Sequence, residues 1–171
     1  VGNNLFVHAG LLPEHVRAGP AAGAGEAVET DAEGVMERMN KEACAWMLGE
    51  ALIPESLWGE NSPLWTRVYS SPDSRDIVEE AREQLEEVLR LTGTKRMFVG
   101  HTPQRAGINS AADGQIWRVD TGMTSMIGGR PEVMEIRGEE MTILTEYKAI
   151  PASKRAARPL PSTAEEELRR Q

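Results

Sequence analysis

The sequence predicts an α/β fold over its N-terminal side and a β meander over its C-terminal side. Short apolar runs that end at glycine or at a turn alternate with two longer segments, in which apolar residues recur at helical spacing. After the second of these segments only short strand-like runs follow. An order of strand, helix, helix, strand and further strands is typical of one half of a larger layered domain.

The first strand is expected at residues 4–9, an apolar run closed by Gly10 and then by Pro13. The stretch that follows, 18–27, is rich in glycine and alanine and contains a proline. Such a composition indicates a loop or an insertion.

The first helix is expected to begin at Thr30 as N-cap, with Glu33 completing a capping box, and to stop before Pro54. Cys44 is the one cysteine of the chain, so no internal disulfide forms, and it is expected as a small buried apolar residue. Residues at helical spacing are expected to face the core: Met36, Met39, Ala43, Trp46 and Met47.

A polar segment with two prolines, 61–74, is expected to be a loop, and the second helix to span about 74–91 and end at Gly93. Its apolar stripe is Ile77, Ala81, Leu85, Val88 and Leu89. Strands are then expected at 96–99, 115–120, 132–137 and 141–145, the last two as a hairpin. Residues 1–150 are expected to form the folded part and 151–171 a flexible tail.

Composition narrows the class of function. The chain has 171 residues, enough for one domain, and a net charge of -8 with its basic residues scattered. This charge argues against a general nucleic-acid or membrane-surface binder, because phosphate groups require a positive surface. No apolar run approaches the roughly 20 residues of a membrane helix, and no signal peptide is recognised. The compartment stays open.

Two of the three histidines stand in matching positions. His8 follows the apolar run in "LFVHAGLLP", and His101 follows another in "FVGHTPQ". A neutral imidazole is a good ligand for divalent metals, and a ligand at a strand end is held rigidly. Either histidine could instead cap a strand edge, but their shared context favours one shared metal. His15 lies after Pro13 and is expected on a turn, at the surface or behind the ligands.

Two further residues are candidates for this site. Asp120 ends a strand in "RVDTGMT"; it could approach the metal, or cap the turn made with Thr121 and Gly122, which is favoured. Arg67 stands between Trp65 and Tyr69, where its planar guanidinium could be steered by stacking and bind phosphate oxygens. An ordinary surface arginine is the alternative for this residue.

These segments together resemble the calcineurin-like metallophosphoesterases, within the phosphoprotein phosphatase superfamily, and most closely the Shewanella-like protein phosphatases. The matching stretches are "LFVHAGLLPEHV", "SPLWTRVYS", "FVGHTPQ" and "WRVDTGMTSMIGGRPEVMEI", which occur in the family's order. Ala9 replaces the first glycine of the family's "HGGL"-type motif. The family's "GDxHG", "GDxVDRG" and "GNHE" motifs do not occur in this sequence.

The resemblance implies the C-terminal half of an αββα metallophosphoesterase sandwich with two divalent metal ions, Mn, Fe or Zn. It implies that His8 and His101 bind one metal and that Arg67 binds the substrate phosphate. The catalytic residues are expected in an N-terminal region outside this sequence, and this chain alone is expected to be inactive. The implied substrate is a phosphoprotein or phosphopeptide; phosphotyrosine against phosphoserine or phosphothreonine stays open.

Two alternatives remain. The same fold could act on nucleotides such as a dinucleoside polyphosphate. A chain without the missing motifs could also be a non-catalytic remnant that binds a partner.

Overall fold

The architecture comes from a computed structural model, which describes residues 1–17, 32–71 and 76–155. The loop expected at 18–27 and the N-cap expected at Thr30 lie outside the described residues. The same is true of residues 156–171, most of the expected tail.

The central sheet has four strands in the order β1-β2-β4-β3. They are β1 (Asn4–Val7), β2 (Arg96–Val99), β4 (Ile116–Arg118) and β3 (Asn109–Ala111). The first three run parallel, with Val7 opposite Val99 and Val99 opposite Arg118, whereas β3 is antiparallel to β4. Three adjacent strands therefore end at one edge of the sheet, and the loops that follow them meet there.

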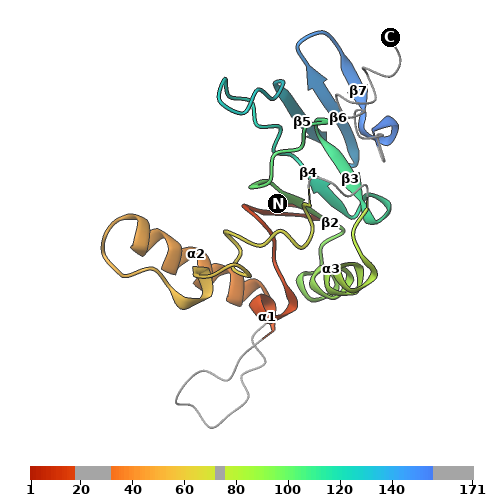
Figure 1. Ribbon diagram of the computed structural model, residues 1–171. Helices are drawn as coiled ribbons and strands as arrows, with labels where there is room; N and C mark the ends of the chain where they lie inside the picture. The colour runs from red at the N-terminus through yellow and green to blue at the C-terminus, as the bar shows by residue number, and fades with distance from the viewer. Residues whose placement is uncertain (18–31, 72–75, 156–171) are drawn as a thin grey trace.

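Helices cover one face of this sheet (Figure 1). They are α1 (Pro13–Val16), α2 (Ala32–Met47) and α3 (Glu79–Thr92). In α2 and α3 apolar residues recur along one side, and α3 ends at Gly93, whose φ of 63° suits a left-handed C-cap. The core of this layer contains Leu5, Met97, Val99 and Ile116 from the sheet, and Ala81, Leu85, Val88 and Leu89 from α3.

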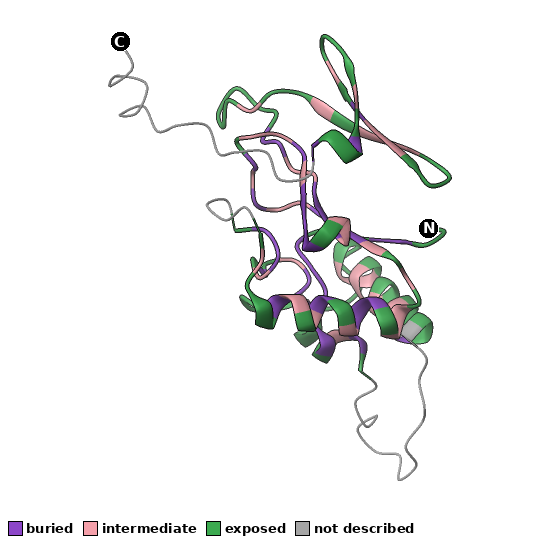
Figure 2. Cartoon of the chain, turned by 90° about the vertical axis from the view of Figure 1, so that its right-hand side faces the viewer, coloured by how far each residue is buried: buried purple, intermediate pink, exposed green. Residues whose placement is uncertain are grey.

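A second, antiparallel sheet packs on the opposite face (Figure 1). It consists of β5 (Glu132–Arg137), β6 (Glu140–Thr145) and β7 (Ala149–Pro151) in that order. A smaller core lies between the sheets, formed by Phe98, Ile108, Trp117, Ile143 and Ala152. Figure 2 shows this buried interior running through the strands while the outer loops stay exposed. The layer order is helix, sheet, sheet, and the expected α/β class is confirmed.

An aromatic row crosses the face of the central sheet that meets the second sheet. Phe6 stacks on Phe98 with ring centroids 4.9 Å apart, and Phe98 lies 6.4 Å from Trp117. Phe98 on β2 and Trp117 on β4 are buried, whereas Phe6 on β1 is 52% exposed. In the described part of the chain, β1 also pairs on one side only. The β1 end of the sheet thus keeps an open edge and an uncovered aromatic side chain.

Several boundaries differ from those expected. The strand at 96–99 and the hairpin are as expected, but α3 begins at Glu79 rather than at 74. Sequence patterns missed α1, β3 and β7, which are too short to show a period, and the 3-10 turns Glu55–Leu57 and Ala152–Lys154. The packed chain extends past residue 150, because Ala152 and Arg155 are both buried.

The expected burial of α2 is wrong near its C-terminal end. Met36 and Met39 pack against the core, but Cys44 is exposed and Met47 is 70% exposed. A helix of 16 residues is about 24 Å long, and only its first part rests on the other helices. Helical spacing identified the correct face but not how far the contact extends.

Candidate active site

His8 and His101 meet at the carboxyl edge of the central sheet. His8 directly follows β1, and the pairing of β1 with β2 continues one step further, as Gly100 N–H donates to the His8 carbonyl at 2.8 Å. His101 lies two residues after the end of β2, and the two imidazole centroids lie 5.2 Å apart at an interplanar angle of 56°. Two residues distant in sequence therefore form one pair because their strands are parallel neighbours.

The backbone at His101 is strained. Its φ is 64°, a value that residues other than glycine rarely adopt. Thr102 N–H donates to the Gly100 carbonyl at 2.7 Å, which places His101 at the centre of a tight turn of the rare positive-φ type. Such strain costs about 1–3 kcal/mol and is found mainly at functional sites, where the surrounding fold enforces it.

The His101 side chain is prepared to act as an electron-pair donor. Its Nε2 is buried and has no hydrogen-bond partner among the described residues. Burial lowers the pKa of His101 below its usual value, the charges of Arg67 and His8 lower it further, and Asp120 opposes them. Trp65 packs its ring edge-on against this imidazole, with centroids 5.1 Å apart. A neutral imidazole with an unused nitrogen fits a metal ligand.

The spacing of the pair also fits a shared cation. Two imidazoles that bind one ion at about 2.0–2.1 Å, at near-tetrahedral angles, have ring centroids about 5 Å apart. In the part of the chain that the structure describes, however, no third His, Cys, Asp or Glu completes a metal-binding cluster. The spacing of the pair is compatible with part of a metal site.

The carboxylate of Asp120 stabilises the loop in which it lies. Its Oδ1 accepts a hydrogen bond of 2.8 Å from Gly122 N–H, so the carboxylate caps the turn after β4. Its carbonyl accepts from Gln104 N–H at 2.8 Å, which ties this loop to the one after β2. Of the two roles considered for Asp120, the turn cap is the one that its contacts support.

A tight contact brings Arg67 to the same edge. Ala9 N–H donates to the Pro63 carbonyl at 2.9 Å, and a Cβ at Gly10 would lie 2.9 Å from Tyr69 Cδ2. Glycine at position 10 thus lets the segment that carries Arg67 lie directly on the His8 loop. Arg67 is exposed, and it is near enough to influence the pKa of His101.

Stacking of Arg67 on Tyr69, one possibility considered from the sequence, does not occur. Tyr69 is wholly buried and donates its hydroxyl to the Leu11 carbonyl at 3.0 Å. Tyr69 lies in a turn in which Ser70 N–H donates to the Arg67 carbonyl at 3.2 Å, and its ring is buried while Arg67 is exposed.

A buried polar network holds the loops of the site together. Ser70 Oγ donates to Thr102 Oγ1 at 2.9 Å, and Gln104 Nε2 donates to the carbonyls of Ser70 at 3.1 Å and Thr102 at 2.9 Å. Asn109 Nδ2 in turn donates to Gln104 Oε1 at 3.1 Å. This network links the Arg67 segment to the loop that carries His101, and its buried hydrogen bonds favour one arrangement of both.

Arg118 extends this network and was not singled out from sequence. It is 1% exposed, and its Nε donates to the Tyr69 carbonyl at 2.7 Å. Burial lowers the pKa of its guanidinium, and Asp76 opposes that change. An arginine inside the apolar strand "IWRV" was the available signal, because a buried cation requires polar partners.

His15 lies apart from this pair and has a structural role. It is in α1, where its Nδ1 accepts from Leu12 N–H at 2.9 Å and closes the first turn. The turn expected after Pro13 is a short helix.

Sequence comparison places these residues among known relatives. The chain is 35% identical to Shewanella-like protein phosphatase 2 of Arabidopsis thaliana over 141 residues, 80% of this chain and 32% of that protein. It is 29% identical to an uncharacterised protein of Schizosaccharomyces pombe over 82% of this chain and 38% of that protein. The chain therefore spans about a third of the length of these curated relatives. The resemblance to Shewanella-like phosphatases is confirmed.

Solved structures share the fold of this chain. The fold matches the crystal structure of the cold-active protein tyrosine phosphatase of a psychrophilic Shewanella species, with a TM-score of 0.55 and 19% identity. That match covers 88% of this chain and 40% of the other. A mutant of a cold-active protein tyrosine phosphatase gives a TM-score of 0.56. At this identity the match establishes a shared fold.

No family model matches the chain. Among the described residues, no helix has the length and apolar character needed to cross a membrane.

Proposed function

We propose that this chain, which is related to part of the Shewanella-like protein phosphatases, forms one half of a metal-dependent phosphatase domain that hydrolyses phosphoric monoesters. The observation that carries the proposal is the pairing of His8 with His101, whose ring centroids lie 5.2 Å apart, with a buried Nε2 on His101 that has no hydrogen-bond partner in the described part of the chain. Arg67, exposed and close to the pair, adds a cationic group for an anionic substrate.

In this proposal His8 and His101 hold one of two divalent ions, of manganese, iron or zinc. Bound metal would lower the pKa of a water molecule and polarise a phosphoryl oxygen. The other metal ligands and the catalytic residues would come from a further part of the domain, so this chain alone would be inactive. Three observations support that division: the chain spans about a third of the length of its relatives, β1 pairs on one side only within the described ranges, and Phe6 is 52% exposed.

The residues of this chain would position the phosphoryl group. Arg67 offers a planar fork of donors that can bind two phosphate oxygens at once. The network of Ser70, Thr102 and Gln104 would fix the distance between this guanidinium and His101. Charge that develops on phosphoryl oxygens would thus meet groups already in place, which is the main source of catalysis in such sites.

The proposed substrate is a phosphoprotein, since the named relatives in both comparisons are protein phosphatases. The test uses the intact protein, with Mn²⁺ supplied, against phosphopeptides that carry phosphotyrosine, phosphoserine or phosphothreonine, and against a dinucleoside polyphosphate. Release of inorganic phosphate from a phosphopeptide is the expected result. Turnover of the dinucleotide alone would favour a nucleotide phosphoesterase, and turnover of neither would favour a non-catalytic binding protein.

Arg67→Ala in the intact protein is expected to lower kcat/KM for a phosphopeptide by on the order of 100-fold, because a positioned donor to the developing charge is lost. Arg67→Lys should retain part of the activity, since an ammonium keeps the charge but not the fork. Steady-state phosphate release measures both variants. Arg90→Ala is the matched control: Arg90 is an exposed arginine in α3, and its loss should leave activity unchanged. Equal activity of Arg67→Ala and Arg90→Ala would remove Arg67 from the site.

A further inference from the structure

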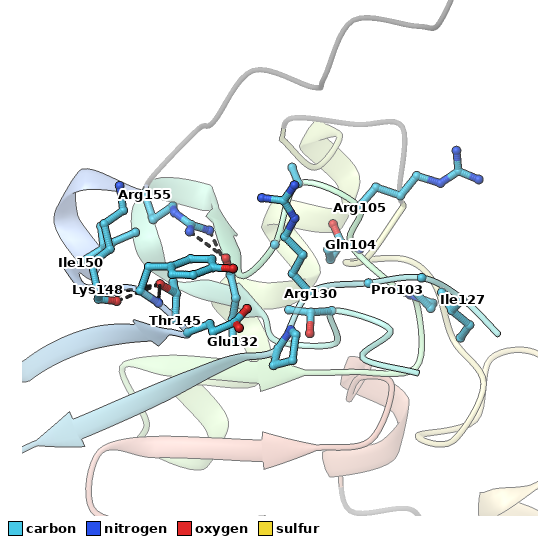
Figure 3. Close-up of a pocket in the computed structure, with 18 of the residues that line it drawn as sticks. Pro103, Gln104, Arg105, Ile127, Arg130, Glu132, Thr145, Lys148, Ile150 and Arg155 are labelled. Carbon is cyan, nitrogen blue, oxygen red and sulfur yellow. Dashed lines mark hydrogen bonds and ion pairs between the residues drawn. The ribbon is translucent and has the colours of Figure 1, made fainter. Parts of the chain in front are cut away.

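A cleft opens beside the histidine pair, on the side of the second sheet. It has a volume of about 1400 Å³. Its walls are four segments: the loop after β2, the loop that leads from Thr121 into β5, the turn between β6 and β7, and the stretch from β7 to Arg155. Figure 3 shows Arg105 and Arg130 rising from two of these walls. The cleft is therefore built from loops whose bases are fixed in the two sheets.

The cleft is lined with cations that lack ion partners. Arg105, Arg130, Lys148 and Lys154 line it, and none of them forms an ion pair with a described residue. Many other cations of the described chain do contact a carboxylate: Arg17, Arg38, Lys41, Arg82, Lys95, Arg96, Arg137 and Arg155. Unpaired positive charge is thus concentrated here, in a chain whose net charge is -8.

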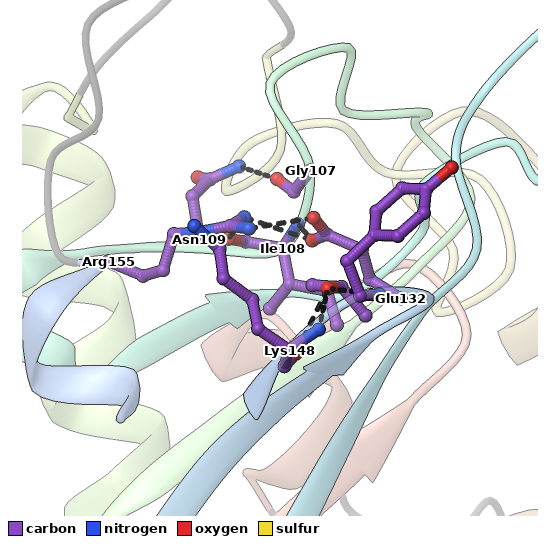
Figure 4. A network of polar contacts seen from close by, with 8 residues as sticks. Gly107, Ile108, Asn109, Glu132, Lys148 and Arg155 are labelled. Atoms are coloured by element: carbon purple, nitrogen blue, oxygen red, sulfur yellow. Dashed lines mark hydrogen bonds and ion pairs between the residues drawn. The ribbon is translucent and has the colours of Figure 1, made fainter. Parts of the chain in front are cut away.

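The acidic residues of the cleft leave most of this charge uncompensated. Glu132 is 8% exposed and is engaged by Arg155, with Nη2–Oε1 at 2.7 Å and Nη1–Oε2 at 3.0 Å (Figure 4). The Glu132–Arg155 pair has no net charge and forms part of the cleft wall. Glu146 is the other acidic residue of the lining, against the four unpaired cations. The cleft therefore attracts anions.

The cleft begins directly beside the candidate active site. Thr102 and Thr121 line it, and each is the residue that follows His101 or Asp120 in the chain. Gln104, whose side chain braces the His101 loop, is also part of the lining. A peptide with its phosphorylated residue at the histidine pair would run from that site into the cleft.

We propose that this basic cleft docks the acidic residues that flank the phosphorylated residue of a protein substrate. The inference rests on the proposed function, since it extends the phosphatase site by a recognition surface. A chain of net charge -8 would repel an acidic peptide without such a patch, and complementary charge at a rim governs association and selectivity. Four separated cations suit a string of carboxylates better than one compact anion.

The test uses the intact protein with Arg105→Glu and Arg130→Glu combined, and with Arg90→Glu on α3 as the matched control. The double variant is expected to raise KM about tenfold for a phosphopeptide with Asp and Glu on both flanks, because two exposed charge contacts are reversed. KM for the same peptide with Ser and Ala flanks, kcat, and turnover of para-nitrophenyl phosphate should stay unchanged. The difference between the two peptides should shrink as salt is added.

The outcomes distinguish a failure of the docking role from a failure of the proposed phosphatase function. An equal change in KM for both peptides, or none for the acidic one, would overturn the docking role. If the unaltered protein hydrolyses no phosphomonoester, the proposed function fails; fluorescence anisotropy with a labelled, unphosphorylated acidic peptide then tests the cleft alone. Binding that weakens about tenfold in the double variant and not in Arg90→Glu supports it, and equal binding by all three proteins rejects it.

Discussion

Intact protein that carries His101→Ala is expected to lose on the order of 1000-fold in kcat/KM for a phosphopeptide, even with excess Mn²⁺. The substitution removes a buried Nε2 that has no other partner among the described residues, and with it one of two adjacent imidazoles. A metal contributes several kcal/mol to catalysis, and each 1.36 kcal/mol is a factor of ten, so about 4 kcal/mol gives this loss. Phosphate release and metal content per protein are the two measurements.

His15→Ala is the matched control for this experiment. His15 is also a partly buried histidine, but its Nδ1 accepts from Leu12 N–H inside α1. Its replacement should lower stability slightly while kcat/KM and metal content stay near those of the unaltered protein. Full activity and full metal content in His101→Ala would remove the metal role from this residue, and the phosphatase proposal would lose its main support.

Glu132→Leu is expected to lower the free energy of unfolding by about 3–5 kcal/mol, because Arg155 is left as an unpaired charge in a buried position. Both side chains of this pair are 8% exposed. Glu132 Oε2 also accepts from Ile108 N–H at 2.8 Å, so the carboxylate joins the loop before β3 to the segment after β7 (Figure 4). Urea unfolding followed by circular dichroism measures the change.

Two further variants show whether the loss of stability comes from leaving a charge buried or from losing a salt bridge of any kind. Arg137→Met breaks the exposed pair with Glu135, where the arginine side chain is 77% exposed, and should cost less than about 1 kcal/mol. The double change Glu132→Leu with Arg155→Met removes both charges and should be more stable than Glu132→Leu alone. A Glu132→Leu protein as stable as Arg137→Met would show that the buried pair contributes little.

Sequence patterns located the parts of the site that depend on strand ends. His8 and His101 each stood after an apolar run, and parallel pairing of β1 and β2 brought them together. The turn cap at Asp120 was also accessible, since aspartate two residues before glycine commonly bonds the backbone of its own turn. Such features follow from local chemistry and from one rule of sheet geometry.

Features that depend on packing between loops could not be predicted in this way. The basic cleft combines Arg105, Arg130 and Lys148 from separate segments, none of which forms a basic run in the sequence. Exposure of Cys44 and Met47 depends on how far α2 extends past its neighbours, which helical spacing does not encode. The inward turn of Tyr69 depends on its contact with the backbone of Leu11.

The pairing of β1 with β2 has a consequence for biogenesis. At a synthesis rate of about 5–20 residues per second, the 93 residues from position 8 to position 101 (101 − 8) take roughly 5–20 s to translate. During that interval the nascent β1 has no β2 beside it. The pair of His8 and His101 can form only after this delay, so under the proposed function metal binding would be a late event in maturation.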